Sequence, residues 1–239
     1  MGDSLAQTWR GVNRDTLVAM AEQPVCAIAG MGRGVSLAVA RRFGSEGFQI
    51  AMLARHAERL AELEQELKAA GIAAHGYTVD LGVEARVRGA FQRMEAEMGR
   101  PSVLVYNASS GRAGRPTSLS ERTLVADFRI NAVAPLWCVQ EVLDGMMEAG
   151  HGTILFTGGG LALAPQADLA SLSLGKAAIR SLTFSLAAEL EPAGIHVATA
   201  TICGFVQEGT HFSADRIAAE FWRLHTQSPG QFETEIMYR

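Results

Sequence analysis

Several features that would place this 239-residue chain in other classes of protein are absent from its sequence. It holds only three cysteines, Cys26, Cys138 and Cys203, and none lies in a C-x-x-C pair or beside a histidine at ligand spacing. We therefore expect neither a disulfide framework nor a zinc site, and the sequence predicts no other metal site. This use of cysteine is typical of a reduced, intracellular protein.

Long hydrophobic runs and an excess of positive charge are missing as well. No apolar stretch reaches the ~18–20 residues that span a membrane, and the first residues lack the basic-then-apolar pattern of a signal peptide. We therefore expect a cytoplasmic protein that has no membrane partner. The formal net charge is −4, which gives no basic footprint for nucleic acid. With 48% hydrophobic and 19% charged residues, the composition suits a compact enzyme domain.

Apolar runs of strand length alternate with stretches of helical periodicity from Pro24 onward. The predicted strands are Val25–Ala29, Gln49–Leu53, Ala74–Val79, Val103–Tyr106, Thr153–Thr157, His196–Ile202 and Glu233–Met237. The predicted helices are Val35–Ser45, His56–Ala70, Val83–Met98, Glu121–Ala149 with a break near Asn131, Leu172–Leu190 and Ala214–Leu224. Near-continuous apolar strands separated by helices indicate a parallel sheet covered on both faces. We therefore predict an α/β fold, a single Rossmann-type doubly wound domain over residues 23–239, with residues 1–22 as a peripheral extension.

A glycine-dense turn joins the first predicted strand to the first predicted helix. Its glycines permit a tight turn and leave backbone N–H groups bare at the positive end of the helix, which favours an anion. The common G-x-G-x-x-G spacing does not fit, whereas G-x-x-x-G-x-small fits with Gly30, Gly34 and Ser36. A strand, a glycine turn and a helix in this order predict a dinucleotide site. The residues expected at the pyrophosphate are Gly30, Gly32, Arg33, Gly34 and Val35.

An acidic residue is missing where a cofactor with a free 2′-hydroxyl would need one. That acid usually stands about 20 residues past the glycines, but Ile50–Arg55 contains none. Arg55 stands there, and Arg33 lies inside the glycine turn, so two guanidinium groups could bind a 2′-phosphate. We therefore expect NADP in preference to NAD. The same missing acid disfavours a methyltransferase that binds S-adenosylmethionine.

These motifs, with others in register, resemble the short-chain dehydrogenase/reductase family across nearly the whole of residues 24–239. The matching positions are Gly30-x-x-x-Gly34-x-Ser36, Arg55, Asp80-Leu81, Asn107-Ala108-Ser109, Asn131, Lys176-Ala-Ala and Cys203-Gly204. The resemblance implies hydride transfer between a nicotinamide cofactor and a small carbonyl or alcohol. It also implies a homodimer or homotetramer built through helices over 132–149 and 176–190.

The same resemblance assigns roles to individual positions. Asp80 and Leu81 would hold the adenine ring, and Asn107 with Ala108 would steady the central strand beside the cofactor. Lys176 would bind the nicotinamide ribose, and Asn131 would hold a water on the proton path. Gly204 would complete the cofactor site.

At two positions where this family has catalytic residues, the chain has residues without a hydroxyl or other acidic group. The tyrosine expected four residues before Lys176 is Leu172, and the serine expected thirteen residues earlier is Gly159. Neither side chain can exchange a proton, and we expect both to line an apolar substrate pocket. Ser171 and Ser173 flank the tyrosine position, but each lies about 100° around the helix and should point away from the site.

Few other side chains could supply the missing proton. Of the three tyrosines, Tyr106 ends a strand near the expected nicotinamide, and His211 lies in the loop after the sixth strand. We predict these two as possible substitute acids, with water as a third source, and we expect Asp168 to cap a helix. The sequence thus leaves two hypotheses. The first is an NADP-dependent oxidoreductase with an atypical or missing proton donor, and the second is a non-catalytic NADP-binding sensor or assembly partner.

Overall fold

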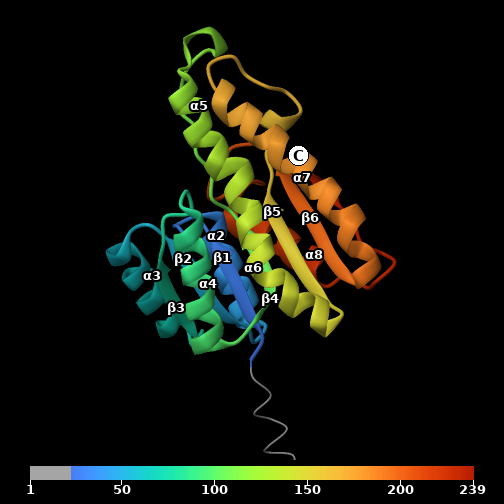
Figure 1. Ribbon diagram of the computed structural model, residues 1–239. Coiled ribbons are helices and arrows are strands. Elements are labelled where there is room, and N and C mark those ends of the chain that lie inside the picture. Colours follow the sequence, from blue (N-terminus) through green and yellow to red (C-terminus); the bar gives the residue numbers. More distant parts are fainter. Residues whose placement is uncertain (1–22) are drawn as a thin grey trace, which may run out of the picture.

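The computed structural model describes residues 23–239 of the chain (Figure 1). The peripheral extension that we expect over residues 1–22 lies outside the described residues. Across the part that is described, no helix is both long and apolar enough to cross a membrane.

Seven parallel strands form one sheet in the order β3-β2-β1-β4-β5-β6-β7. The strands are β1 (Val25–Ala29), β2 (Gln49–Ala54), β3 (Ala74–Thr78), β4 (Pro101–Tyr106), β5 (Gly152–Thr157), β6 (Ile195–Ile202) and β7 (Glu235–Tyr238). The chain winds outward from β1 in one direction as far as β3 and in the other from β4 onward. The order therefore reverses between β1 and β4, and ligands of such sheets bind at that crevice, beyond the carboxyl ends of the strands.

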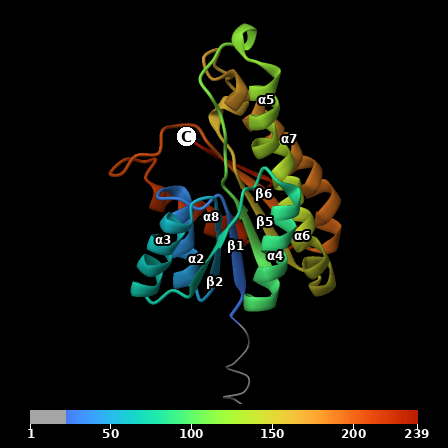
Figure 2. The ribbon, with the colours of Figure 1, turned by 60° about the vertical axis from the view of Figure 1, so that its left-hand side comes forward.

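Helices cover both faces of the sheet, as the two views of Figures 1 and 2 show. The helices are α2 (Val35–Ser45), α3 (Ala57–Ala69), α4 (Glu84–Met98), α5 (Glu121–Phe128), α6 (Ala134–Ala149), α7 (Ala170–Leu190) and α8 (Ala214–His225). Short helical segments lie at η1 (Pro116–Ser118), η2 (Arg129–Val133), η3 (Gly160–Ala162) and η4 (Glu191–Ala193). One apolar core packs α2, α3 and α8 on the sheet, and a second packs α4, α6 and α7 on the opposite face. The predicted α/β doubly wound fold is confirmed.

The boundaries of the elements follow the sequence pattern closely. Strand β1 and helix α2 begin and end at the predicted residues. Helix α7 begins at Ala170, two residues before the prediction, and β7 ends one residue later than predicted. The break predicted near Asn131 is the π-helical segment η2, which joins α5 to α6. Such segments interrupt helices mostly where a function or a tertiary contact requires it.

Candidate functional site

A cleft of about 820 Å³ opens over the carboxyl ends of the central strands. It is lined by the glycine turn before α2, by the ends of β4 and β5, by α7 and by the loop after β6. The lining includes Gly32, Arg33, Gly34, Val35, Ser36, Asn107, Ser109, Thr157, Gly158, Gly159, Gly160, Lys176, Cys203, Gly204, Phe205 and Val206. The cleft therefore gathers most of the positions that the sequence predicts for a nucleotide.

The glycine turn is held in shape from within and from the neighbouring strands. Gly30 has φ +93°, and a Cβ there would lie 2.3 Å from the backbone nitrogen of Ala108, so only glycine fits this close approach. The N–H groups of Gly30 and Met31 both donate to the Leu53 carbonyl, at 2.9 and 3.0 Å. The Ser36 hydroxyl accepts from the Gly32 N–H at 2.9 Å and donates to the Gly32 carbonyl at 3.1 Å. This bond explains why a small hydroxyl residue stands at the third position of the motif.

The start of α2 is open toward the cleft. Gly34 is the N-cap, and no side chain caps this helix end, so its backbone N–H groups are free for a ligand. A Cβ at Gly32 or Gly34 would meet no atom within 4 Å. Open space beside bare N–H groups at a helix N-terminus fits the pyrophosphate of a dinucleotide.

A series of hydrogen bonds that involve side chains joins the ends of three strands beneath the cleft. The Asn107 amide donates to the Gly30 carbonyl at 3.1 Å, and the Thr157 hydroxyl donates to the Asn107 side-chain oxygen at 2.9 Å. The N–H groups of Asn107 and Ala108 both donate to the Ala29 carbonyl. These contacts tie β1, β4 and β5 together and fix the floor of the cleft.

Lys176 lies on α7 and points into the cleft. Its ammonium donates to the Thr157 carbonyl at 2.7 Å, and burial lowers the pKa of this lysine to about 8. A Cβ at Gly159 would lie 3.4 Å from the Lys176 side chain, so the glycine leaves space beside the lysine. Lys176 is therefore a proton-bearing group poised near neutral pH inside the cleft.

The predicted adenine end lies in a separate, smaller cavity of about 460 Å³, which Arg55 and Asp80 line. The Asp80 carboxylate accepts from the Gly82 N–H at 2.9 Å, and Leu81 is buried beneath it. Arg33, by contrast, lines the main cleft and is paired with Glu66 at 2.9 Å. The two arginines that the sequence places together at the 2′-phosphate thus line different cavities.

The structure does not bring Tyr106 into the cleft. Its side chain is 2% exposed, and its hydroxyl donates to the Ile130 carbonyl at 2.6 Å. Burial raises the pKa of Tyr106 well above its usual value. Because successive strand residues point to opposite faces of a sheet, the phenol packs in the core under α6 and cannot serve as the proton donor.

His211 and Leu172 also lie outside the lining of the cleft. His211 is exposed and stacks on the Tyr238 ring, with the ring centroids 4.5 Å apart. Leu172 packs against the backbone of Gly111, where an added Cβ would lie 2.7 Å from the Leu172 Cβ. Of the two expected substrate-pocket residues, the structure therefore places only Gly159 in the cleft.

The Asn131 side chain is engaged with the backbone of one residue. Its amide oxygen accepts from the Ser110 N–H at 2.9 Å, and its amide nitrogen donates to the Ser110 carbonyl at 2.6 Å. Gly175 of α7 lies directly against this amide, because a Cβ there would be 2.3 Å from the Asn131 nitrogen. The geometry gives Asn131 the role of holding the loop after β4.

A buried carboxylate that the sequence did not reveal holds the same loop. Asp127 is 1% exposed and accepts from the hydroxyls of Ser110 and Ser171, both at 2.6 Å, and from the Arg112 N–H at 3.2 Å. Burial acts to raise the pKa of Asp127, but these hydrogen bonds outweigh it and lower the pKa. Ser171 points away from the cleft, as the helical rotation predicts. Asp168, expected as a helix cap, is instead paired with Arg115 at 3.0 Å, and Leu169 takes the N-cap position of α7.

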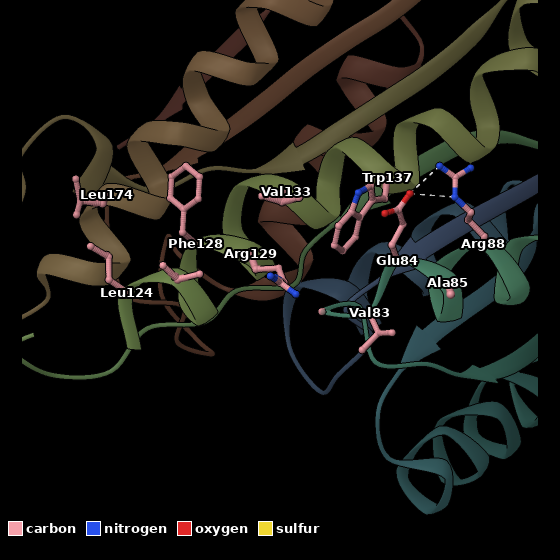
Figure 3. A pocket seen from close by; sticks show the side chains of 12 residues that line it. Val83, Glu84, Ala85, Arg88, Leu124, Phe128, Arg129, Val133, Trp137 and Leu174 are labelled. Atoms are coloured by element: carbon pink, nitrogen blue, oxygen red, sulfur yellow. Dashed lines mark hydrogen bonds and ion pairs between the residues drawn. The ribbon is translucent and has the colours of Figure 1, made fainter. Parts of the chain in front are cut away.

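Another hollow, about 990 Å³ in volume and mostly apolar, lies among α4, α5, α6 and α7 on the outer surface (Figure 3). Leu124, Phe128, Val133, Trp137 and Leu174 line it. Phe128 and Leu174 are 42% and 51% exposed, so the apolar lining is open to solvent. The Glu84–Arg88 ion pair at 2.8 Å forms one edge. Exposed apolar patches of this kind mark interaction surfaces.

Comparisons with known proteins agree with this geometry. Residues 24–219 match the sequence model of the short chain dehydrogenase family. The chain is 30% identical to a 2,3-dihydro-2,3-dihydroxybenzoate dehydrogenase of Bacillus subtilis, over 79% of this chain and 70% of that protein. It is 28% identical to a putative ketoacyl reductase of Streptomyces coelicolor, over 88% and 81% of the two chains. A metagenomic short-chain oxidoreductase solved in complex with NADP is 27% identical, with a TM-score of 0.82 over 90% of this chain and 96% of that chain.

Proposed function

Since the chain belongs to the short chain dehydrogenase family, we propose that it is an NADP(H)-dependent oxidoreductase acting on a small carbonyl or alcohol. The observation that carries the proposal is a single cleft that joins an uncapped glycine turn to the half-buried Lys176. The turn supplies N–H donors for a pyrophosphate, and the lysine supplies a proton-bearing group at the other end.

NADP is favoured over NAD by charge at the adenine end. No acid stands at the end of β2, where it would repel a 2′-phosphate, and Arg55 stands there instead. The NADP complex of the metagenomic relative supports the same choice.

When bound, the nicotinamide supplies or accepts the hydride. In the reducing direction, the carbonyl oxygen needs one proton, and we assign its transfer to the Lys176 ammonium. The neutral amine left behind regains a proton from solvent at the open mouth of the cleft. A general acid contributes about 10²–10⁴-fold to the rate of such a reaction. Because Gly159 has no hydroxyl that could donate to the carbonyl oxygen of the substrate, we expect this site to be slower than one with the family's tyrosine and serine.

The walls around Lys176 favour a small, apolar substrate. Leu161, Leu163 and Ala164 line one side of the cleft after β5. Phe205 and Val206 line the other side and are 91% and 45% exposed. We therefore propose aldehydes, ketones or alcohols without charged groups as substrates.

Direct titration tests the cofactor. We expect the purified protein to bind NADPH more tightly than NADH, and we expect slow oxidation of NADPH over a panel of small apolar carbonyls. Failure of both dinucleotides to bind would contradict the proposal. Tight NADPH binding without turnover of any carbonyl in the panel would favour the alternative, a non-catalytic NADP-binding sensor or assembly partner. The absence of a tyrosine at residue 172 and a serine at residue 159 supports this alternative.

Turnover at saturating NADPH tests the proton donor. The carbonyl reduction rate should fall as pH rises through about 8, where the Lys176 ammonium loses its proton. Lys176→Met should abolish this pH dependence and lower the rate at least tenfold. Tyr106→Phe and His211→Ala are the matched controls and should leave the rate unchanged, because neither residue lines the cleft.

Restoring a hydroxyl at Gly159 gives an independent test. Gly159 has extended backbone (φ −170°), and a Cβ there would lie 3.4 Å from the Lys176 side chain, so a serine fits. Gly159→Ser places a hydroxyl beside Lys176 that can donate to the carbonyl oxygen, and we expect turnover to rise at least tenfold. An unchanged rate in a folded Gly159→Ser variant would argue against carbonyl reduction beside Lys176.

We further propose that the protein is a homodimer or homotetramer built on the outer faces of α5, α6 and α7. The apolar hollow of Figure 3 and the exposed Val125, Leu136 and Phe184 support this assembly. A second copy of the same face would cover these side chains isologously.

A further inference from the structure

Three arginines line the smaller cavity at the open edge of β3. Arg55 follows the end of β2, while Arg86 and Arg93 lie on α4. The two α4 arginines are seven residues apart, which is close to two helical turns, so they project from the same face of the helix. Gly89 separates them and also lines the cavity, and a Cβ at Gly89 would meet no atom within 4 Å. The space between the two arginines is therefore open.

These arginines differ from their neighbours in having no acidic partner. Within residues 23–239, none of the three forms an ion pair with a carboxylate. Arg88, on the same helix, is paired with Glu84 at 2.8 Å and with Glu141 at 2.9 Å. At the glycine turn, Arg33 is paired with Glu62 and Glu66. Arg88 and Arg33 are thus neutralised by carboxylates, whereas the three arginines of this cavity keep their charge free for a ligand.

The chemistry of the cavity suits a phosphate group. Guanidinium groups bind phosphate through paired, charge-assisted hydrogen bonds, and three of them around one cavity repel one another until an anion joins them. Thr78 adds a hydroxyl to the lining. The one carboxylate in the lining, Asp80, has an oxygen already engaged by the Gly82 N–H.

We propose that this cavity is an anion site in which Arg55, Arg86 and Arg93 bind a phosphate group. Two sources of phosphate are compatible with its position beside the predicted adenine end. One is the 2′-phosphate of NADP, in which case the inference rests on the proposed function and moves the discrimination between NADP and NAD from Arg33 to α4. The other is a separate phosphate ion or phosphate ester.

Binding of inorganic phosphate to the full chain, measured by calorimetry at constant ionic strength, tests the site. The double change Arg86→Gln/Arg93→Gln should weaken phosphate binding at least tenfold. The matched control Arg59→Gln/Arg122→Gln removes the same net charge from two exposed arginines outside the cavity, neither of which has an ion pair within residues 23–239. This control should bind phosphate as the unchanged protein does. Equal phosphate affinity in the unchanged protein and the Arg86/Arg93 variant, or equal weakening in the control, would overturn the proposal.

Titration of the same variants with NADPH and NADH identifies the source. Loss of NADPH affinity with unchanged NADH affinity, and competition between NADPH and phosphate, would assign the site to the 2′-phosphate. Loss of phosphate binding with both nucleotide affinities unchanged would assign it to a separate ligand. If the unchanged protein binds no dinucleotide, the proposed function fails, whereas the phosphate titration still decides the anion site by itself.

Discussion

At the scale of single residues, the cleft depends on two groups that make very close or fully buried contacts. Gly30 lets the β4 end approach the glycine turn, and Asp127 holds the loop that follows β4. Neither touches the proposed substrate. Both act by fixing backbone that lines or borders the cleft.

Substitution of Gly30 should destabilise the fold strongly. In Gly30→Ala the new methyl group would overlap the Ala108 backbone and the residue would keep a positive φ, so we expect a loss of about 2–4 kcal/mol in the free energy of unfolding. Gly89→Ala on α4 is the matched control. It should stabilise the protein by about 0.5–1 kcal/mol, because its methyl group meets no atom and alanine favours a helix. Urea unfolding of both variants measures the loss and the gain in the free energy of unfolding.

The Asp127 network should make stability depend on pH in the acid range. A carboxyl whose pKa is lower in the folded than in the unfolded protein stabilises the fold above its unfolded pKa, near 4, and this contribution is lost as pH falls through the folded pKa. In Asp127→Asn the amide nitrogen cannot accept a hydrogen bond, so we expect a loss of about 2–3 kcal/mol at pH 7. The difference from the unchanged protein should shrink steadily below about pH 4. Asp144→Asn, at an exposed position of α6, is the control and should change the free energy of unfolding at pH 7 by less than about 0.5 kcal/mol in urea melts.

At the scale of elements, the π-helical segment η2 joins α5 and α6 where α7 crosses them. Asn131 of η2 bonds the Ser110 backbone, and Gly175 of α7 lies against the same amide. The wider turn of the π-helix presents the amide to the loop after β4, and the missing side chain at residue 175 lets α7 pack there. One local irregularity thus positions two helices and a cleft-bordering loop.

A methyl group at Gly175 should separate these elements. Gly175→Ala would place a Cβ 2.3 Å from the Asn131 nitrogen, and we expect a loss of about 1–3 kcal/mol in stability. Hydrogen exchange should rise at the Ser110 amide, whose N–H loses its partner. In Gly145→Ala on α6 the new methyl group would lie nearest to the Arg100 side chain, at 3.0 Å, and should leave this exchange unchanged. Unaltered exchange at Ser110 in Gly175→Ala would show that the loop is held without Asn131.

At the scale of the whole molecule, the two helical faces differ in what they leave exposed. The face of α5, α6 and α7 carries an apolar hollow with large exposed side chains (Figure 3). If a second copy covers this face, a charge at its centre should prevent assembly. We expect Phe128→Glu to convert the assembly to a smaller species in sedimentation measurements, whereas Arg59→Glu on α3 should not. A monomeric unchanged protein would refute the proposed assembly.

The fold could be predicted from the sequence because its signal is local and periodic. Apolar runs such as Val25–Ala29 indicate buried parallel strands by themselves, and the glycine turn fixes where the first helix begins. The absence of an acidic residue near Arg55 is also visible in the sequence alone. The same holds for the absence of a tyrosine at residue 172 and a serine at residue 159, because these positions are found by counting along the chain.

Contacts between residues far apart in the sequence depend on how the elements pack. Tyr106 ends a strand at the right height, but the side to which its phenol points depends on how β4 faces α6, and this removed it as a proton donor. Asp127 meets Ser171 across 44 positions of sequence, and Arg55 meets Arg86 and Arg93 only because α4 packs beside β3. The order of residues alone predicts which elements form and which chemical groups are present, because both follow from short-range pattern. The packing of the elements determined which groups share a cavity, since burial and proximity are properties of the folded chain alone.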